Sequence, residues 1–244
     1  HLDEPLWSQY VDYVRHAAVL DLGPSYKYPG KTVNDIIAET FPVSAQLGII
    51  SLLLAIGAGV LAGMAAAWYK NTWIDYAMMI GATLGVSVPS FILAAVLIQL
   101  FAFTWPILPA LALAAQPTAF IMRLTRSSLL DALGQDYIRT ARSRGIGTRS
   151  LICRHALRNA LLPVVSYIGP LAAALLTGSF IVETIFAIPG LGRHFVTSIY
   201  NRDYTVILGI TIFYSFLIMM MNLLIDVIYP LLDPRITIDG KKEG

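Results

Sequence analysis

The sequence predicts an all-α polytopic membrane protein. Of its 244 residues, 57% are hydrophobic and 13% are charged, and the mean hydropathy is +0.68. These values exclude an ordinary soluble domain. Five long runs contain no Asp, Glu, Lys or Arg: 42–67, 76–104, 107–122, 159–182 and 204–225. In a bilayer, runs of this kind satisfy their backbone polar groups by forming helices.

The first 41 residues form a polar, acidic segment ahead of the first run. They contain six acidic and three basic residues, and five Trp and Tyr residues are interleaved with these: Trp7, Tyr10, Tyr13, Tyr26 and Tyr28. A shortage of basic residues beside a span is typical of the outer side. We therefore interpret residues 1–41 as an external segment whose aromatic side chains anchor at the membrane interface or pack together. A ligand-binding surface is the alternative.

A helix needs about 20 residues to cross the hydrocarbon layer. Four of the five runs reach this length, but run 107–122 does not. We expect its helix to continue through Arg123 and Arg126, with both side chains extending to the inner headgroups. Only Trp105 and Pro106 separate this run from the one before it, so either the external loop here is short or residues are absent from it.

Small residues recur inside the runs at the spacing of close helix packing. Gly59 and Gly63 form one G-x-x-x-G face, and Gly81 and Gly85 form another. Prolines inside the runs each remove a backbone hydrogen bond and favour a kink. They are Pro89, Pro117 and Pro170.

The segment 123–158 lies between the third and fourth runs and is strongly basic. It contains eight Arg and two Asp, a net charge of +6 in a chain whose total is +2. Basic residues beside spans are retained in the cytoplasm, so this segment is predicted to face inward. We expect two short helices joined by a turn, with Asp136 capping the first and Gly145 ending it in the left-handed conformation. Alternation of the spans then places residues 1–41 outside and implies one further crossing before them.

The segment 183–204 carries two acids and two Arg. Pro189, Gly190 and Gly192 predict a turn between two amphipathic stretches. Such a segment can enter the outer leaflet if it is buried among the helices.

The basic segment resembles a known family. The run DYIRTARSRG at 136–145, followed by RHALRNALLPV, is similar to the Glu-Ala-Ala-x-x-x-Gly coupling loop of ABC-importer permeases, with Arg139 and Thr140 where Glu and Ala are usual. Further matches are DLGPSYKYPGKTVNDII, FPVSAQLG, TGSFIVETIFAIPGLGRHFVTSIYNRDY and DVIYPLLDPRI. Together they cover nearly the whole chain and resemble the peptide and nickel branch, above all the B subunits of oligopeptide permeases.

The resemblance implies the transmembrane domain of a type I ABC importer, with five spans present of an expected six. It divides the chain into the external segment 1–41, a transmembrane domain at 42–235 and a cytoplasmic tail at 236–244. Within the domain, 123–158 becomes the cytoplasmic coupling loop, and 183–204 becomes an external scoop beneath a binding protein. The implied partners are a second homologous permease, two ATPase subunits that carry ATP and Mg, and an extracytoplasmic peptide-binding protein, all at the cell membrane of a prokaryote.

The resemblance and the composition together predict three groups of functional residues. Those expected to contact an ATPase subunit are Tyr137, Arg139, Thr140, Ala141, Arg142, Gly145 and His155. Small and weakly polar residues are expected to line the translocation path, because a route for varied peptides should not hold any side chain tightly; they are Ser87, Pro89, Ser90 and Thr177. The scoop residues are Glu183, Pro189, Gly190 and Gly192. We read Ser87, Ser90 and Ser179 as donors of helix–helix hydrogen bonds rather than as nucleophiles.

Several functions are excluded or disfavoured. The chain has no G-x-x-x-x-G-K-[ST] loop, so ATP must be hydrolysed by a partner if transport uses it. The four His residues have no metal-ligand spacing, and the single Cys153 excludes an internal disulfide. We therefore expect no catalytic residues, cofactor or metal in this chain.

Two other classes of function compete with the importer subunit. An ion-coupled transporter or channel is one, although the runs lack ionisable residues. A nucleic-acid binder is the other, with contact to inner-leaflet phosphates as the simpler reading of the Arg residues. Within the importer class, oligopeptides are the expected substrates, and dipeptides, glutathione or nickel remain alternatives.

Overall fold

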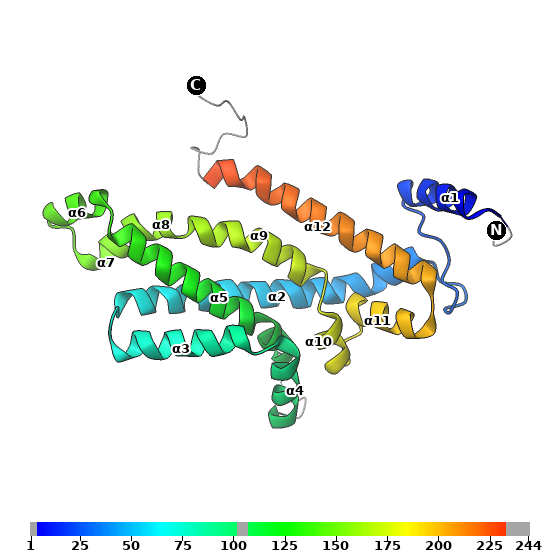
Figure 1. Ribbon diagram of the computed structural model, residues 1–244, viewed down its shortest axis with the longest axis horizontal. Coiled ribbons are helices and arrows are strands. Elements are labelled where there is room, and N and C mark those ends of the chain that lie inside the picture. Colours follow the sequence, from blue (N-terminus) through cyan, green and yellow to red (C-terminus); the bar gives the residue numbers. More distant parts are fainter. Residues whose placement is uncertain (1–3, 102–106, 233–244) are drawn as a thin grey trace, which may run out of the picture.

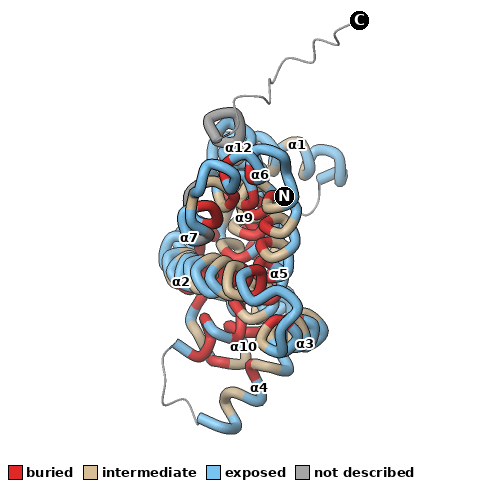
Figure 2. The backbone as a smooth tube through the Cα atoms, turned by 90° about the vertical axis from the view of Figure 1, so that its left-hand side faces the viewer, coloured by how far each residue is buried: buried red, intermediate tan, exposed pale blue. Residues whose placement is uncertain are grey.

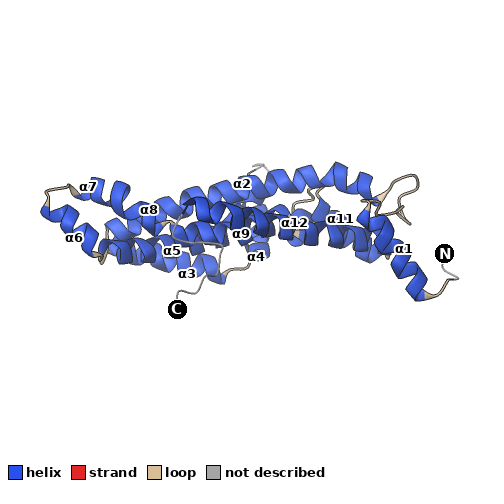
Figure 3. Ribbon diagram, turned by 90° about the horizontal axis from the view of Figure 1, so that it is seen from above, coloured by secondary structure: helices blue, strands red, loops and turns tan. Residues whose placement is uncertain are grey.

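The computed structural model describes residues 4–101 and 107–232, and the regular elements in these ranges are helices (Figure 3). The helices formed by the apolar runs are α2 (Val33–Trp68), α3 (Trp73–Ser87), α4 (Ser90–Phe101), α5 (Leu108–Leu133), α9 (Leu162–Leu176) and α12 (Tyr204–Leu232). The other helices are α1 (Leu6–Ala18), α6 (Asp136–Ser143), α7 (Thr148–Ser150), the π-helix η1 (Leu151–Ala156), α8 (Leu157–Ala160), α10 (Phe180–Ile185) and α11 (Leu191–Asn201). The junction at Trp105 and Pro106 and the predicted tail 236–244 lie outside the described residues.

The molecule is an elongated bundle with two different ends. Helices α2, α3, α5, α9 and α12 run along its long axis, α6 and α7 lie at one end, and α1 lies at the other (Figure 1). Buried residues follow the middle of the bundle (Figure 2). The main apolar core joins α2, α5 and α9, and α5 also packs against α3 and α4. The basic segment and the N-terminal segment are therefore held far apart.

Helix α2 begins before the first apolar run. Its N-terminus is fixed by a capping box, in which Thr32 Oγ1 accepts from the Asp35 amide and the Asp35 carboxylate accepts from the Thr32 amide. The helix then continues through Pro42 to Trp68. The predicted boundary between residues 41 and 42 thus falls inside a helix, because a local cap outweighs the change in hydropathy.

The first predicted glycine face is confirmed. A Cβ at Gly59 would lie 2.8 Å from the Ile121 Cβ, and one at Gly63 would lie 2.6 Å from the Met122 carbonyl oxygen. Only glycine lets α2 approach α5 this closely. In the second face, Gly85 packs with a distance of 3.0 Å from its virtual Cβ to Ala119, whereas Gly81 faces open space. In the second face, only one of the two glycines therefore packs as the spacing predicts.

The second apolar run is not one straight span. It breaks after Ser87, and α3 and α4 are bent by 103° relative to each other. Pro89 follows Val88, which is extended at φ −88° and ψ 117°. Proline supplies no amide donor and disfavours the helical conformation in the residue before it, so the predicted kink becomes a complete break.

Within the described residues, three stretches are long and apolar enough to cross a membrane: Val33–Trp68, Leu157–Ile185 and Tyr204–Val227. The bent pair α3–α4 would be a fourth if it is one span. Helix α5 has 26 residues, but its second half is polar. The chain is thus a multi-pass membrane protein, and the number of five spans stays a prediction.

Helix α5 does continue through Arg123 and Arg126, as expected, but Arg126 does not extend to the headgroups. Its Nε and Nη2 each donate a 2.6 Å hydrogen bond to the carboxylate of Asp75 on α3. The side chain of Asp75 is 1% exposed and that of Arg126 is 21% exposed. A buried carboxylate needs a partner of this kind, so tertiary pairing outweighs the pull of the interface.

Arg126→Ala should therefore destabilise the protein strongly. Removing one partner of a buried pair leaves an uncompensated charge, at a cost of about 3–5 kcal/mol. Thermal unfolding in detergent should show a large drop for Arg126→Ala and little change for Arg123→Ala, which removes the same charge from an exposed position. Adding Asp75→Asn to Arg126→Ala should recover part of the loss. Equal melting of the two single variants would contradict the assignment.

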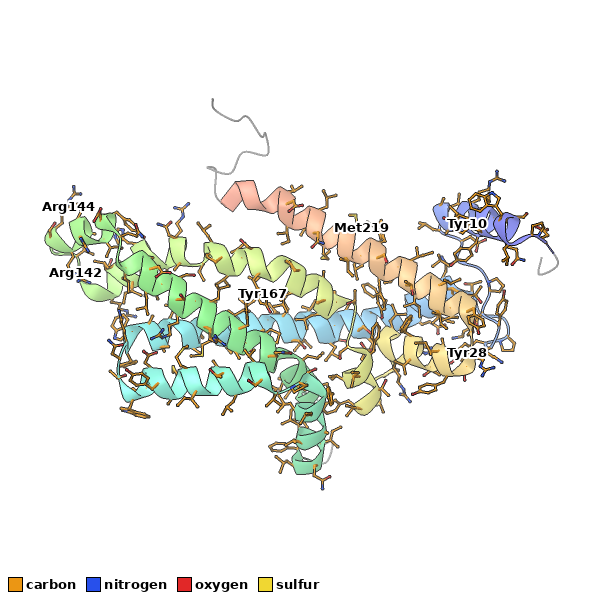
Figure 4. The ribbon with its side chains drawn as sticks, in the orientation of Figure 1. Tyr10, Tyr28, Arg142, Arg144, Tyr167 and Met219 are labelled. Atoms are coloured by element: carbon orange, nitrogen blue, oxygen red, sulfur yellow. The ribbon has the colours of Figure 1, made fainter. Side chains whose placement is uncertain are left out.

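The two ends of the bundle should lie on opposite sides of the membrane. Figure 4 shows Arg142 and Arg144 at one end and Tyr10 and Tyr28 at the other. In a Cys153→Ala background, cysteines introduced at the exposed positions Ser150 and Lys27 should react with an impermeant thiol reagent from opposite sides of intact and inverted vesicles. Reaction of both from the same side would overturn the orientation.

Candidate functional site

Helix α6, at the basic end of the bundle, rests on a cluster of buried apolar side chains. Ile138 and Ala141 are buried in a cluster with Leu129, Leu151 and Ile152. The helix ends at a turn in which Gly145 has φ +80°, as predicted. Gln135 occupies the N-cap position, and Asp136 lies in the first turn, so the predicted cap is displaced by one residue. An acid in the first turn still favours the helix through its dipole.

Most residues predicted to contact an ATPase subunit lie on the outer face of this end. The exposed ones are Tyr137, Arg139, Thr140, Arg142 and Gly145. His155 is half-buried in η1. Ala141 is only 9% exposed and faces the cluster, so it supports α6 from below and does not present itself to a partner.

The second helix of the basic segment is irregular. The chain passes from α7 through the π-helix η1 into α8, in place of the single helix that the sequence predicts. π-Helical turns are uncommon and often accompany functional sites. Asn159 Nδ2 in α8 donates to the Tyr137 hydroxyl at 3.1 Å, which ties α6 to the start of the next span.

The middle of the bundle contains a cavity of about 560 Å³. It is lined by residues from α3, α4, α5, α9 and α10, including Ser90, Gln116 and Tyr167. The rings of Phe120 and Tyr167 form one wall, with centroids 4.4 Å apart. Tyr167 lies between the two ends of the bundle (Figure 4).

One of the four predicted path residues, Ser90, lines this cavity. Ser87 and Pro89 lie at the break between α3 and α4, and Thr177 lies where α9 ends. Ser87 Oγ donates to the Thr83 carbonyl within its own helix. Ser179 Oγ accepts from the Val182 amide and caps α10. The expected helix–helix hydrogen bonds are therefore wrong for Ser87 and Ser179, because nearby backbone groups compete for hydroxyls.

The scoop segment is built around a buried carboxylate. Glu183 is 0% exposed, although the sequence suggests an external position. Its Oε1 accepts from Ser44 Oγ on α2 at 2.8 Å, and its Oε2 accepts from the Arg193 amide at 3.1 Å. Ser44 Oγ in turn accepts from the Leu191 amide at 2.8 Å. One side chain thus joins α2, α10 and the first turn of α11.

Three glycines give this carboxylate its space. Virtual Cβ atoms at Gly178, Gly190 and Gly192 would lie 2.3, 2.4 and 2.9 Å from its oxygens. The predicted turn between α10 and α11 is present, with Pro189 exposed in it. Gly190 and Gly192 in this turn allow the backbone to approach Glu183 closely, and neither has positive φ.

A second buried carboxylate was missed in the sequence, where Asp203 counted only toward the charge balance. Asp203 is 0% exposed and accepts from Ser25 Oγ and from the Tyr26 and Lys27 amides. Burial raises its pKa, but the hydrogen bonds from Ser25, Tyr26 and Thr205 outweigh this, so the pKa lies below the usual range. The hydrogen bonds to the Asp203 carboxylate therefore hold at neutral pH and weaken only as the pH falls through that low pKa. One signal in the sequence could have indicated this contact: Ser25 and Asp203 both lie in segments that resemble the family.

The arrangement of several membrane-length helices, with an exposed basic helix at one end, is the fold of ABC-transporter membrane domains. Two solved structures share this fold. The chain matches the MetNI methionine ABC transporter, in an inward-facing conformation, with a TM-score of 0.67 and 16% identity over 81% of this chain and 96% of that one. It matches an amino acid ABC transporter with a TM-score of 0.65 and 17% identity, over 81% and 94%.

The chain belongs to the family of binding-protein-dependent transport system inner membrane components, whose pattern matches residues 59–238. It is 48% identical to the dipeptide transport system permease protein DppB of Bacillus subtilis, over 99% of this chain and 82% of that protein. It is 43% identical to the oligopeptide transport system permease protein OppB of Salmonella typhimurium, over 97% and 82%. The predicted family is confirmed.

Gly190→Ala should lower the stability of the packing around Glu183 in segment 183–204. Its Cβ would press on Glu183 Oε2 and on Ser44 Oγ, 2.6 Å away, and overpacking of this kind costs about 1–3 kcal/mol. Gly81→Ala is the matched control, because its Cβ meets open space on a helix. Thermal unfolding should show a loss for Gly190→Ala and none for Gly81→Ala. Unchanged melting of Gly190→Ala would mean that the carboxylate is not held there.

Proposed function

We propose that this chain is the membrane permease subunit of an ATP-driven importer of short peptides. The observation that carries the proposal is the combination of a rigidly mounted basic helix at one end with a cavity between broken helices in the middle. The names of the relatives supply the substrate class. They include oligopeptide and dipeptide permeases, so oligopeptides are the proposed substrate and dipeptides the alternative.

In this proposal, α6 docks into an ATPase subunit. Its exposed face carries Arg139 and Arg142, and Arg144 follows directly, which favours an acidic groove as the receiving surface. Its buried face is fixed by Ile138 and Ala141, so the helix can move as a rigid body with the bundle. Because the chain lacks a phosphate-binding loop, ATP and Mg belong to these partners.

The remaining partners follow from the same proposal. A second homologous permease completes the membrane domain, two ATPase subunits lie on the cytoplasmic side, and an extracytoplasmic peptide-binding protein docks above the scoop. The family description, which refers to binding-protein-dependent transport and to the inner membrane, supports this assembly and a location in the cell membrane of a prokaryote. The scoop's rigidity, through Glu183, suits a surface on which another protein must dock.

Gly145→Val tests the docking helix. A β-branched residue at φ +80° costs about 1–3 kcal/mol, which is comparable with the coupling free energy of allosteric transitions. The variant should insert normally but bind the ATPase subunits more weakly, or lose the stimulation of ATP hydrolysis by peptide.

Gly147→Val is the matched control. A Cβ at either glycine meets no atom within 4 Å, but only Gly145 has positive φ. Vesicles containing the assembled transporter should be assayed for peptide uptake and ATP hydrolysis together. Full coupling in both variants would remove the docking assignment and favour contact of this loop with inner-leaflet phosphates. Absence of ATP-dependent peptide uptake by the unmodified complex would overturn the proposed function itself.

A further inference from the structure

Three helix discontinuities meet at the central cavity. Val86 and Ser90 flank the break between α3 and α4. Pro117 interrupts the hydrogen-bond ladder of α5, and Gly178, with φ +80°, lies at the break between α9 and α10. All four residues line the same cavity of about 560 Å³. Irregular backbone at membrane depth is tolerated where it is buried in protein or lines a cavity, and discontinuous helices supply polar groups there.

Two of these discontinuities leave backbone carbonyls of cavity-lining residues with a weak hydrogen bond or without their usual helix donor. Pro117 has no amide hydrogen, so the carbonyl of Leu113 lacks the donor that a helix would normally provide. Leu113 itself lines the cavity. At the first break, Gln116 Nε2 donates to the Val86 carbonyl at 3.3 Å, which is long for such a bond, so a ligand could replace it. The amide of Gln116 also retains an acceptor oxygen.

The chemistry of the lining selects the ligand. Among the described residues that line the cavity there is no Asp, Glu, Lys, Arg or His, so neither a metal ion nor a free anion finds a charged partner. The polar side chains are uncharged, and the walls are aliphatic and aromatic, with Phe120, Tyr167 and Phe180 among them. The volume lies within the range of small-ligand sites. Groups that both donate and accept, beside variable apolar surface, are the features of a peptide main chain.

We infer that this cavity is a main-chain binding site for the transported peptide, in which Gln116 and the backbone carbonyls of Val86 and Leu113 pair with peptide amides. Side chains of the peptide then lie against the aliphatic and aromatic walls without specific partners. The inference rests on the proposed function and adds the mode of recognition. It explains how one site can accept peptides of different sequence, because every peptide carries the same amides.

Thiol protection tests the site in the assembled complex. In the Cys153→Ala background, Ser90→Cys and Ala174→Cys place thiols in the cavity, and Leu100→Cys places one on the exposed part of α4. Trialanine should slow alkylation of the two cavity cysteines several-fold and leave Leu100→Cys unchanged. Trileucine should protect as trialanine does, whereas trialanine with N-methylated amides should not.

Gln116→Leu in the Ser90→Cys background should raise the trialanine concentration for half protection about tenfold, the equivalent of one hydrogen bond. Gln99→Leu, on α4 and outside the cavity lining, should not change it. Equal protection by the N-methylated peptide, or equal effects of the two Gln variants, would overturn main-chain recognition. Peptide uptake by the Cys153→Ala parent is measured in parallel. Uptake without protection removes the inference and leaves the proposed function intact, whereas protection without uptake leaves a peptide-binding cavity but removes the proposed function and, with it, the role of this cavity in transport.

Discussion

A fully buried carboxylate constrains the packing of α2, α10 and α11 in this molecule. Glu183 is fully buried, and its oxygens are satisfied by Ser44 on α2 and by the backbone at the start of α11. An ionised group without such partners would cost many kcal/mol in a medium of low dielectric constant. The three glycines around it allow the necessary close approach. Helices α2, α10 and α11 must therefore keep their relative positions for both oxygens of Glu183 to keep their hydrogen bonds.

Two other buried acids connect distant segments in the same way. Asp203 holds the turn at Ser25 against the start of α12, and Asp75 holds α3 to α5 through Arg126. Asp203 fixes the end that carries α1, Asp75 lies toward the end that carries α6, and Glu183 lies beside the cavity, against Gly178. The middle of the bundle is held by apolar contacts and glycine packing, which have no direction. Directional polar contacts thus hold the two ends and one wall of the cavity, and apolar packing holds the rest of the centre.

The sequence predicts those features that depend on local composition. The apolar runs predict the long helices, the spacing of Gly59 and Gly63 predicts their contact with α5, and Gly145 predicts the left-handed turn. Features that depend on a distant partner are not visible. A hydropathy pattern cannot show that Glu183 turns inward to meet Ser44, 139 residues away, or that Arg126 meets Asp75. Nor can it distinguish Ala141 as a buried support from a contact residue, since alanine suits both surfaces.

The helices that line the cavity are also the helices that lead to the basic end. Only two residues, Gly134 and Gln135, separate the end of α5 from α6, and α8 leads into α9 through Leu161. A displacement of α6 therefore acts directly on two walls of the cavity. On the other side, Phe180 lines the cavity and stacks on Phe195 of α11, with ring centroids 5.0 Å apart. The cavity walls thus connect to both ends through packed, continuous elements, and the discontinuities at Pro89 and Pro117 are the points at which those walls can bend away from the hydrogen bonds of Glu183.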